Sequence, residues 1–192
     1  MSFITGTQTE LLYALPSAVT KNTFTTEAVI SAVAGTTEVC SLDPGYFRSV
    51  PKPIGRSLYL RAEGIIANTA AATFALNLGL DTTVGTKANS TTVNAAYTPT
   101  ASVTAPWHLE AWYTCTAFTS STMTLQVNGK IEYESVAAGG APTTTRQVSG
   151  FQTSLTGLDP RVQFYVELFG TWNASSSSNT TTLHQMFLFG LN

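Results

Sequence analysis

Few side chains in this sequence could carry out acid–base or metal chemistry, and two short patterns contain the best candidates. His108 and Glu110 are two residues apart, so on a strand they share one face, where they could exchange a proton or hold a metal ion. Glu132 and Glu134 have the same spacing, and a pair of carboxylates performs glycoside hydrolysis in many enzymes. We expect both pairs to be solvated, because no third metal ligand is visible and catalytic carboxylates come from different strands.

The cysteines and the common enzyme motifs add no further candidate. Cys40 and Cys115 are far apart in the sequence and match no CxxC, zinc or redox spacing, so we expect two buried free thiols. The sequence contains no HExxH, GxSxG, GxxxxGK[ST] or GxGxxG pattern. We therefore predict that the protein is not an enzyme and that it uses no metal or other cofactor.

The charge balance argues against two classes of partner. The chain has 9 Lys and Arg against 11 Asp and Glu, and 10% of its residues are charged, where an ordinary soluble domain has about 25%. This balance argues against a nucleic-acid-binding tail, and no apolar run reaches the roughly 18 residues that cross a bilayer. The N-terminus resembles no secretory signal, so we expect no export by that route. A surface with so little charge self-associates unless partners cover it.

The elements that position these residues are predicted to be strands. Thr accounts for 33 of the 192 residues, and β-branched side chains favour pleated sheets. Apolar residues alternate with polar ones in 56–66, 73–80 and 107–118, whereas no stretch of 11 to 18 residues holds a convincing helical period. About eight to ten strands with Gly, Pro and Asn turns predict an all-β antiparallel sandwich or barrel. Residues 1–22 alternate poorly, and we expect them to form an extended N-terminal arm on a domain of residues 23–192.

One hairpin is predicted within residues 122–134. Met123, Leu125 and Val127 alternate up to Asn128-Gly129, and Ile131 and Tyr133 alternate beyond it. Asn-Gly between two alternating runs is typical of a type I′ turn, because both central residues of that turn need positive φ.

Two late segments are apolar on both faces, which predicts an interface. They are 164–169 and 186–189, whereas one face of an antiparallel sandwich normally meets water. Either a loop or a second subunit must cover the other face, and we favour the subunit. The candidate interface residues are Tyr165, Phe169, Met186, Phe187 and Leu188.

A basic stretch and two tryptophans could also contact a partner. Four of the 9 basic residues lie between positions 48 and 61. From this stretch we take Arg48, Lys52 and Arg56 as candidate contacts for an acidic surface; the alternative is an ordinary solvated segment. Trp112 and Trp172 could stack on a sugar, although an aromatic residue on a strand more often packs in a core.

Four segments, in this order, resemble a family of virion proteins of tailed bacteriophages, the jelly-roll head decoration or minor capsid proteins. The segments are LDPGYF (42–47), IGRSLYLRAEGII (54–66), APWHLEAWYTCTAF (105–118) and FGTWNASSSSNTTTLHQMFLF (169–189). The resemblance covers about residues 20–192, and the order and spacing of the segments carry it.

The resemblance implies a jelly-roll sandwich that forms a homotrimer on the outer surface of a phage head. Its partners would be the major capsid protein and other copies of itself, with no nucleic acid and no membrane involved. It would be made in the host bacterial cytoplasm and would stabilise the virion as a cement protein. The alternative is a trimeric tail or fibre-tip protein that binds a host receptor or glycan. A carbohydrate-active enzyme on a jelly-roll scaffold is a third reading, which fold alone never excludes.

Overall fold

The computed structural model describes residues 9–32, 39–48, 53–68, 72–86, 90–92, 97, 104–136 and 142–191. These residues form twelve strands, and none of them lies in a helix. One sheet, sheet A, contains β1 (Thr9–Ala14), β2 (Val19–Asn22), β5 (Ser57–Ala67), β8 (Thr104–Phe118), β9 (Met123–Val136), β10 (Pro142–Leu158) and β12 (Thr180–Leu191). The other, sheet B, contains β3 (Ala28–Val29), β4 (Ser41–Leu42), β6 (Phe74–Asp81), β7 (Ser90–Thr92) and β11 (Phe164–Trp172).

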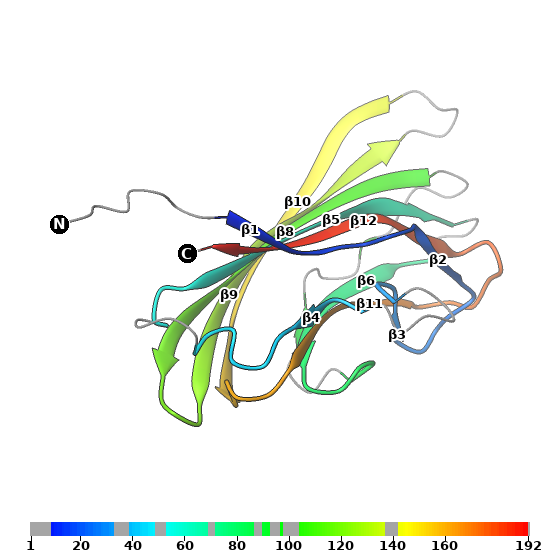
Figure 1. Ribbon diagram of the computed structural model, residues 1–192. Coiled ribbons are helices and arrows are strands. Elements are labelled where there is room, and N and C mark those ends of the chain that lie inside the picture. The colour runs from blue at the N-terminus through cyan, green and yellow to red at the C-terminus, as the bar shows by residue number, and fades with distance from the viewer. Residues whose placement is uncertain are drawn as a thin grey trace.

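The two sheets lie on one another as layers (Figure 1). Sheet A has the order β1-β12-β5-β8-β9-β10, with β2 also paired to β12, and sheet B has the order β3-β11-β6-β7, with β4 also paired to β11. Every strand pair is antiparallel. The prediction of an all-β protein built from packed antiparallel sheets is confirmed.

Alternating residues explain the core between the layers. On β5, Leu58, Leu60 and Ala62 are fully buried while their odd-numbered neighbours face outward. Sheet B contributes residues such as Leu76 and Leu168 to the same cluster. Each fully buried large side chain stabilises the fold by roughly 1.5–3 kcal/mol. Cys40 and Cys115 are buried free thiols, as predicted.

The predicted hairpin at Asn128-Gly129 is wrong. Strand β9 runs without interruption from Met123 to Val136, and Asn128 is paired with Trp112 on one side and Gln152 on the other. The sequence holds the reason, because the odd-numbered residues remain apolar on both sides of Asn-Gly. A two-residue turn would have reversed that phase.

Gly129 is required for packing rather than for a turn. A Cβ at this position would clash with the carbonyl oxygen of Glu110 and with the ring of Phe151. Phe151 stands directly opposite Gly129 on β10, so the aromatic ring covers the bare backbone. Aromatic residues stabilise glycines in sheets in this way.

The predicted extended arm is wrong for the part of it that the structure describes. Residues 9–14 and 19–22 form β1 and β2, and both pair with β12. A bulge between Leu11 and Tyr13 interrupts the alternation of β1, which explains why the sequence pattern looked weak. Residues 1–8 lie outside the described part of the chain. The boundary predicted at residue 22 therefore does not separate an arm from the sandwich.

Three of the five candidate interface residues are buried inside a single chain. Met186 and Leu188 point from β12 into the core, and neither is exposed. Phe169 lies on the outer face of sheet B but is only 3% exposed, because its ring covers Gly79. These residues cannot form a surface between folded subunits, so this part of the prediction is corrected.

The other two candidates retain some exposure. Tyr165 on β11 and Phe187 on β12 are half-buried and face outward from their sheets. A loop of the same chain approaches β11, where Gly85 N donates a hydrogen bond to Glu167 Oε2 (2.8 Å). The loop after β6 therefore covers part of the outer face of β11, at Glu167.

Candidate functional site

The outer face of sheet A gathers many of the polar groups of this charge-poor chain. Both histidines of the sequence lie there, together with charged residues of both signs from the middle strands. The strands that contribute are β5, β8, β9 and β12. The outward-facing polar residues are Arg61, Glu63, His108, Glu110, Lys130, Glu132, Glu134, His184 and Gln185.

Strand register sets these side chains in rows that run across the sheet. Glu63 on β5 pairs with His108 on β8, which pairs with Glu132 on β9. The next row joins Arg61, Glu110 and Lys130 in the same way. Side chains of directly opposite residues are close enough to interact. The spacing of His108 and Glu110 therefore places two neighbouring rows on one face, as predicted.

A bulge in β12 adds the last wall of the site. The pairing of β12 with β5 shifts between Leu183 and Gln185, and both His184 and Gln185 are exposed as a result. A regular strand would have turned one of these two side chains inward. Opposite the bulge lies Gly64, where a Cβ would clash with the Thr182 carbonyl oxygen.

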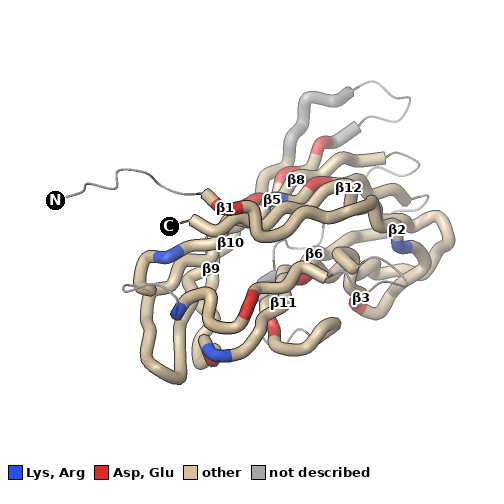
Figure 2. The backbone as a smooth tube through the Cα atoms, in the orientation of Figure 1, with Lys and Arg blue, Asp and Glu red and all other residues tan. Residues whose placement is uncertain are grey.

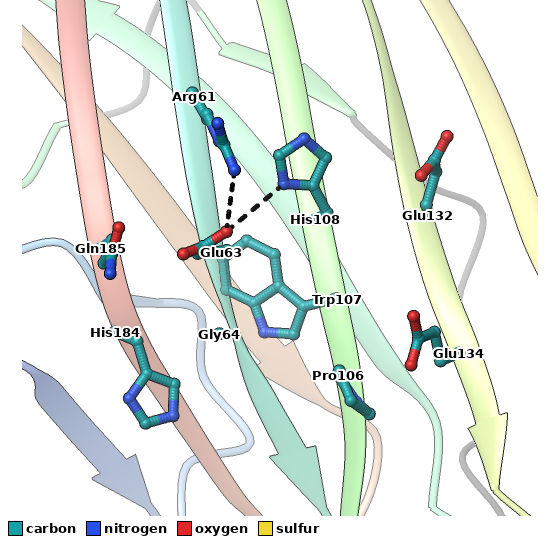
Figure 3. Close-up of a pocket in the computed structure, with 10 residues that line it drawn as sticks. All are labelled: Arg61, Glu63, Gly64, Pro106, Trp107, His108, Glu132, Glu134, His184 and Gln185. Carbon is teal, nitrogen blue, oxygen red and sulfur yellow. Dashed lines mark hydrogen bonds and ion pairs between the residues drawn. The ribbon is translucent and has the colours of Figure 1, made fainter. Parts of the chain in front are cut away.

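Most of these polar residues line a groove of about 650 Å³ on the outer face of sheet A, whereas Glu110 and Lys130 lie outside its lining (Figure 3). Figure 3 shows Arg61 and His108 both directed at Glu63, with Glu134 on β9 to one side of them and His184 on β12 to the other. Pro106 and the buried Trp107 complete the lining. Polar side chains therefore form most of the lining, and Pro106 and Trp107 supply its apolar part.

The charged groups form one connected network. Glu63 accepts from Arg61 Nη2 at 3.4 Å and lies 3.8 Å from His108 Nδ1. On the other side of the imidazole, His108 Nε2 is 3.5 Å from Glu110 Oε1. Lys130 Nζ then joins Glu110 at 3.2 Å to Glu132 at 3.1 Å. We call these six residues the ion-pair network.

Glu110 is held in its charged form. The Tyr59 hydroxyl donates a hydrogen bond to Glu110 Oε1 (2.8 Å), and this bond, with Lys130 and His108, lowers the pKa of Glu110. Burial and the same hydrogen bond raise the pKa of Tyr59 to about 12. A general acid for glycoside hydrolysis needs a raised pKa, so Glu110 is suited to binding hydrogen-bond donors instead.

The structure brings the two predicted pairs together and adds partners that sequence reasoning missed. His108, Glu110, Glu132 and Glu134 share one face, but Glu132 is nearly buried and paired with Lys130. Within the described ranges, no three His, Cys, Asp or Glu side chains lie together as a metal site of that kind would need. The outward parity of β5 and β9 was the available signal for the missed residues Arg61, Glu63 and Lys130.

An aromatic row adjoins the ion-pair network on the same face. Trp112, Tyr59 and Phe189 are paired directly across β8, β5 and β12, and Phe187 follows along β12. The ring centroids are 5.0 Å apart for Trp112 and Tyr59, 6.0 Å for Tyr59 and Phe189, and 6.2 Å for Phe187 and Phe189. We call these four residues the aromatic stripe. Leu11 on β1, opposite Phe189, extends it and is 55% exposed.

The orientation of the rings limits what the aromatic stripe can bind. The planes of Trp112 and Tyr59 are inclined by 33°, and those of Tyr59 and Phe189 by 24°, so neighbouring rings cover one another's faces. Sugar stacking needs free ring faces, which this row offers mainly at its ends. Trp172, the other sugar-stacking candidate, is fully buried and packs on Phe74 at 5.1 Å, so that alternative is wrong for Trp172.

The three candidate capsid contacts do not share one environment. Arg48 is exposed, while Lys52 lies outside the described residues. The Arg56 guanidinium lies over the Tyr46 ring, 3.8 Å from its centroid, and donates to the Tyr46 carbonyl oxygen. The Arg56 guanidinium therefore already makes contacts within the chain. The contact role of these residues stays a prediction.

No helix in the described part of the chain is long and apolar enough to cross a membrane. Comparison of the chain with protein-family models, with curated proteins and with solved structures gives no match.

Proposed function

We propose that this chain is a structural protein of a bacteriophage virion that decorates the outer surface of the head and binds through the outer face of sheet A. The observation that carries the proposal is the aromatic stripe, with Trp112 36% exposed and Leu11 55% exposed. Protein interfaces are enriched in aromatic residues at their centre and have a polar rim. The ion-pair network lies beside the stripe, where such a rim would be.

The strand order supports the jelly-roll part of the proposal. Strands β2, β12, β5 and β8 are neighbours in sheet A, and β3, β11, β6 and β7 are neighbours in sheet B. A chain that alternates between sheets in this order follows the two Greek keys of a jelly roll. The long strands β9 and β10 are an addition at one edge of sheet A.

Stabilisation of the head would come from area buried across the boundaries between capsid subunits. Each Å² of apolar surface removed from water contributes roughly 25 cal/mol, less the cost of ordering. A modest contact repeated over a shell adds up to a large reinforcement. A homotrimer would present three copies of the aromatic stripe at once, which strengthens binding through effective concentration.

The second candidate is a tail or fibre-tip protein that binds a host receptor or glycan. The groove favours it, because the carboxylates, imidazoles and amide that line it can hydrogen-bond to sugar hydroxyls. In this case ligand binding would depend on Glu63 and Gln185, which face each other across β5 and β12. In the decoration role, binding would depend on Trp112 and Phe187.

The copy number of the chain tests the proposal. Quantitative mass spectrometry of intact heads and separated tails measures it relative to the major capsid protein. A simple fraction of the capsid protein, found with the heads, is the expected result. A few copies that separate with the tails would favour the receptor-binding candidate, and absence from particles would contradict both.

A pair of surface variants then tests whether the outer face of sheet A binds the head. Trp112→Ser should reduce the number of copies bound to heads, because it removes the most exposed ring of the stripe. Val162→Ser is the matched control, since Val162 is also exposed, at 37%, but lies before β11. Equal binding by Trp112→Ser and the wild type would contradict docking through sheet A.

A further inference from the structure

The outer face of sheet B contains two carboxylates buried side by side. Asp81 ends β6 and is 7% exposed, and Glu167 lies in β11 and is 2% exposed. Asp81 stands opposite Tyr165, which places Glu167 diagonally across from it on the same face. Diagonal neighbours in an antiparallel pair have Cα atoms about 7–8 Å apart, within reach of their side chains.

One short loop is tied to both carboxylates. Asp81 Oδ1 accepts hydrogen bonds from the backbone N–H groups of Thr82 (2.7 Å) and Thr83 (3.3 Å). Glu167 Oε2 accepts one from Gly85 N (2.8 Å). Gly85 has a φ of +76°, which favours glycine at this turn. The loop after β6 therefore folds back onto β11 and holds one oxygen of each acid.

The second oxygen of each acid has no hydrogen-bond partner among the described residues. Asp81 Oδ2 and Glu167 Oε1 are both buried, and so is the unpartnered Asn77 Oδ1 further along β6. No strand of sheet B contains Lys or Arg (Figure 2). Burying an ionised carboxylate without a positive partner is costly, so these acids need a compensating group.

We propose that a divalent cation, with Ca²⁺ as the best match, binds between Asp81 Oδ2 and Glu167 Oε1 beneath the loop of residues 82–86. Ca²⁺ takes oxygen ligands in flexible geometry, including carboxylates, backbone carbonyls and water. Mg²⁺ demands a nearly ideal octahedron, which two acids and a tight loop supply less readily. The bound ion would fasten the loop after β6 to β11.

Two other groups, a proton and a lysine, are alternatives to a cation for balancing the buried negative charge, and they predict a different result in the test below. Burial and the charge of Asp81 raise the pKa of Glu167, so a proton on this acid would serve without any metal. Lys87, which lies outside the described residues, follows the loop directly and is a candidate counter-charge. Neither a proton nor Lys87 would make the stability of the chain depend on Ca²⁺.

Thermal unfolding of the full chain in EDTA, MgCl₂ and CaCl₂ tests the proposal. With free Ca²⁺ a hundredfold above the Kd, the melting temperature should rise by roughly 5–10 °C, and Mg²⁺ should have a smaller effect. Asp81→Asn and Glu167→Gln should abolish the rise, and both should melt above the wild type in EDTA because a buried charge is removed. Asp159→Asn is the control, since Asp159 is paired with Arg161 at 2.6 Å, and should keep the full rise.

Terbium luminescence gives a second measurement that does not depend on stability. Tyr165, directly opposite Asp81, should sensitise Tb³⁺ bound at the site, and Ca²⁺ should displace it. Tyr165→Phe should weaken this signal while keeping the calcium-dependent rise in melting temperature. Equal melting in EDTA and CaCl₂, or a rise that persists in both acid variants, would overturn the proposal.

Discussion

Acidic side chains on the outer faces of the two sheets differ in whether they have a positively charged partner. On sheet A, Glu63, Glu110 and Glu132 lie among Arg61, His108 and Lys130, and each has a partner within 4 Å. On sheet B, Asp81 and Glu167 are buried under a loop, each with one oxygen unpartnered among the described residues.

The difference teaches that the presence of a neighbouring cation, rather than exposure alone, decides what a strand carboxylate can do, since Glu132 on sheet A is 8% exposed and Asp81 on sheet B is 7% exposed. The Lys130 side chain is 43% exposed, and exposed ion pairs contribute only about 0–1 kcal/mol each. Such a network can be rearranged at low cost when a partner binds. A buried carboxylate is expensive unless it is neutralised, so sheet B is suited to a fixed structural role.

The largest expected effect comes from comparing one phenylalanine on each outer face. Phe169→Ala on sheet B should cost about 3–5 kcal/mol, because its ring is buried against Gly79. Phe187→Ala on sheet A should cost about 1 kcal/mol, since its side chain is half-buried. Urea unfolding measures both, and equal losses would mean that sheet A is covered as thoroughly as sheet B.

A second substitution at this position, Phe187→Asp, tests self-association. If copies of the chain meet through the aromatic stripe, light scattering should find a trimer for the wild type and a smaller species for Phe187→Asp. A monomeric wild type, with Phe187→Asp equally well folded, would rule out association through this face.

A glycine series gives the next largest effect. Gly64→Ala, beneath the groove of sheet A, should cost about 1–3 kcal/mol because its Cβ would clash with the Thr182 carbonyl oxygen. Gly85→Ala, in the loop over sheet B, should cost about 1 kcal/mol because its φ is +76°. Gly150→Ala is the control, since its Cβ would lie 3.8 Å from the nearest atom and its φ is ordinary. Chemical denaturation of the three variants checks this order.

The contributions of Glu167 on sheet B and Glu110 on sheet A to folding stability should change with pH in opposite directions. In EDTA, the raised pKa of Glu167 stabilises the fold below the usual Glu pKa of about 4.3, and that contribution is lost as pH rises through the folded value. The lowered pKa of Glu110 contributes stability above its usual pKa, which is lost as pH falls through the folded value.

The matched variants should separate these two contributions. Relative to the wild type, Glu167→Gln should gain stability as pH rises, whereas Glu110→Gln should lose its disadvantage as pH falls. Unfolding curves from acid to neutral pH measure both. Parallel curves for the two variants would show that the two acids share one environment.

The smallest expected effect is the loss of one cation from the ion-pair network. Arg61→Met should cost about 0.2–1 kcal/mol at low salt, because it removes the contact to Glu63 and both side chains are partly exposed. Added salt should shrink this difference, since screening weakens exposed pairs. A loss that is large and independent of salt would mean that the network is buried in an assembly.

The strands could be predicted from sequence because alternation is a local signal, as Leu58, Leu60 and Ala62 illustrate. The turn predicted at Asn128-Gly129 was wrong because Asn-Gly is a strong local turn signal, but the apolar residues keep to odd-numbered positions on both sides of it, as in one continuous strand. The bulge between Leu11 and Tyr13 hid a strand by shifting its pattern.

The candidate site could be predicted only in part. Spacing of two residues placed His108 with Glu110 on one face, but the partners Glu63 and Lys130 depend on which strands are neighbours. Strand order is a non-local property that alternation does not encode. The burial of Glu167 depends on a loop 82 positions away in the chain, which no local pattern reports.

The most direct test of docking through sheet A is hydroxyl-radical footprinting of the chain, free and bound to heads. Oxidation of Trp112 and Phe187 on sheet A should fall on binding, while that of Val84 and Val162, exposed near sheet B, should stay unchanged. Protection of Val84 and Val162 with Trp112 still reactive would contradict the account and place the docking surface on the opposite side of the molecule.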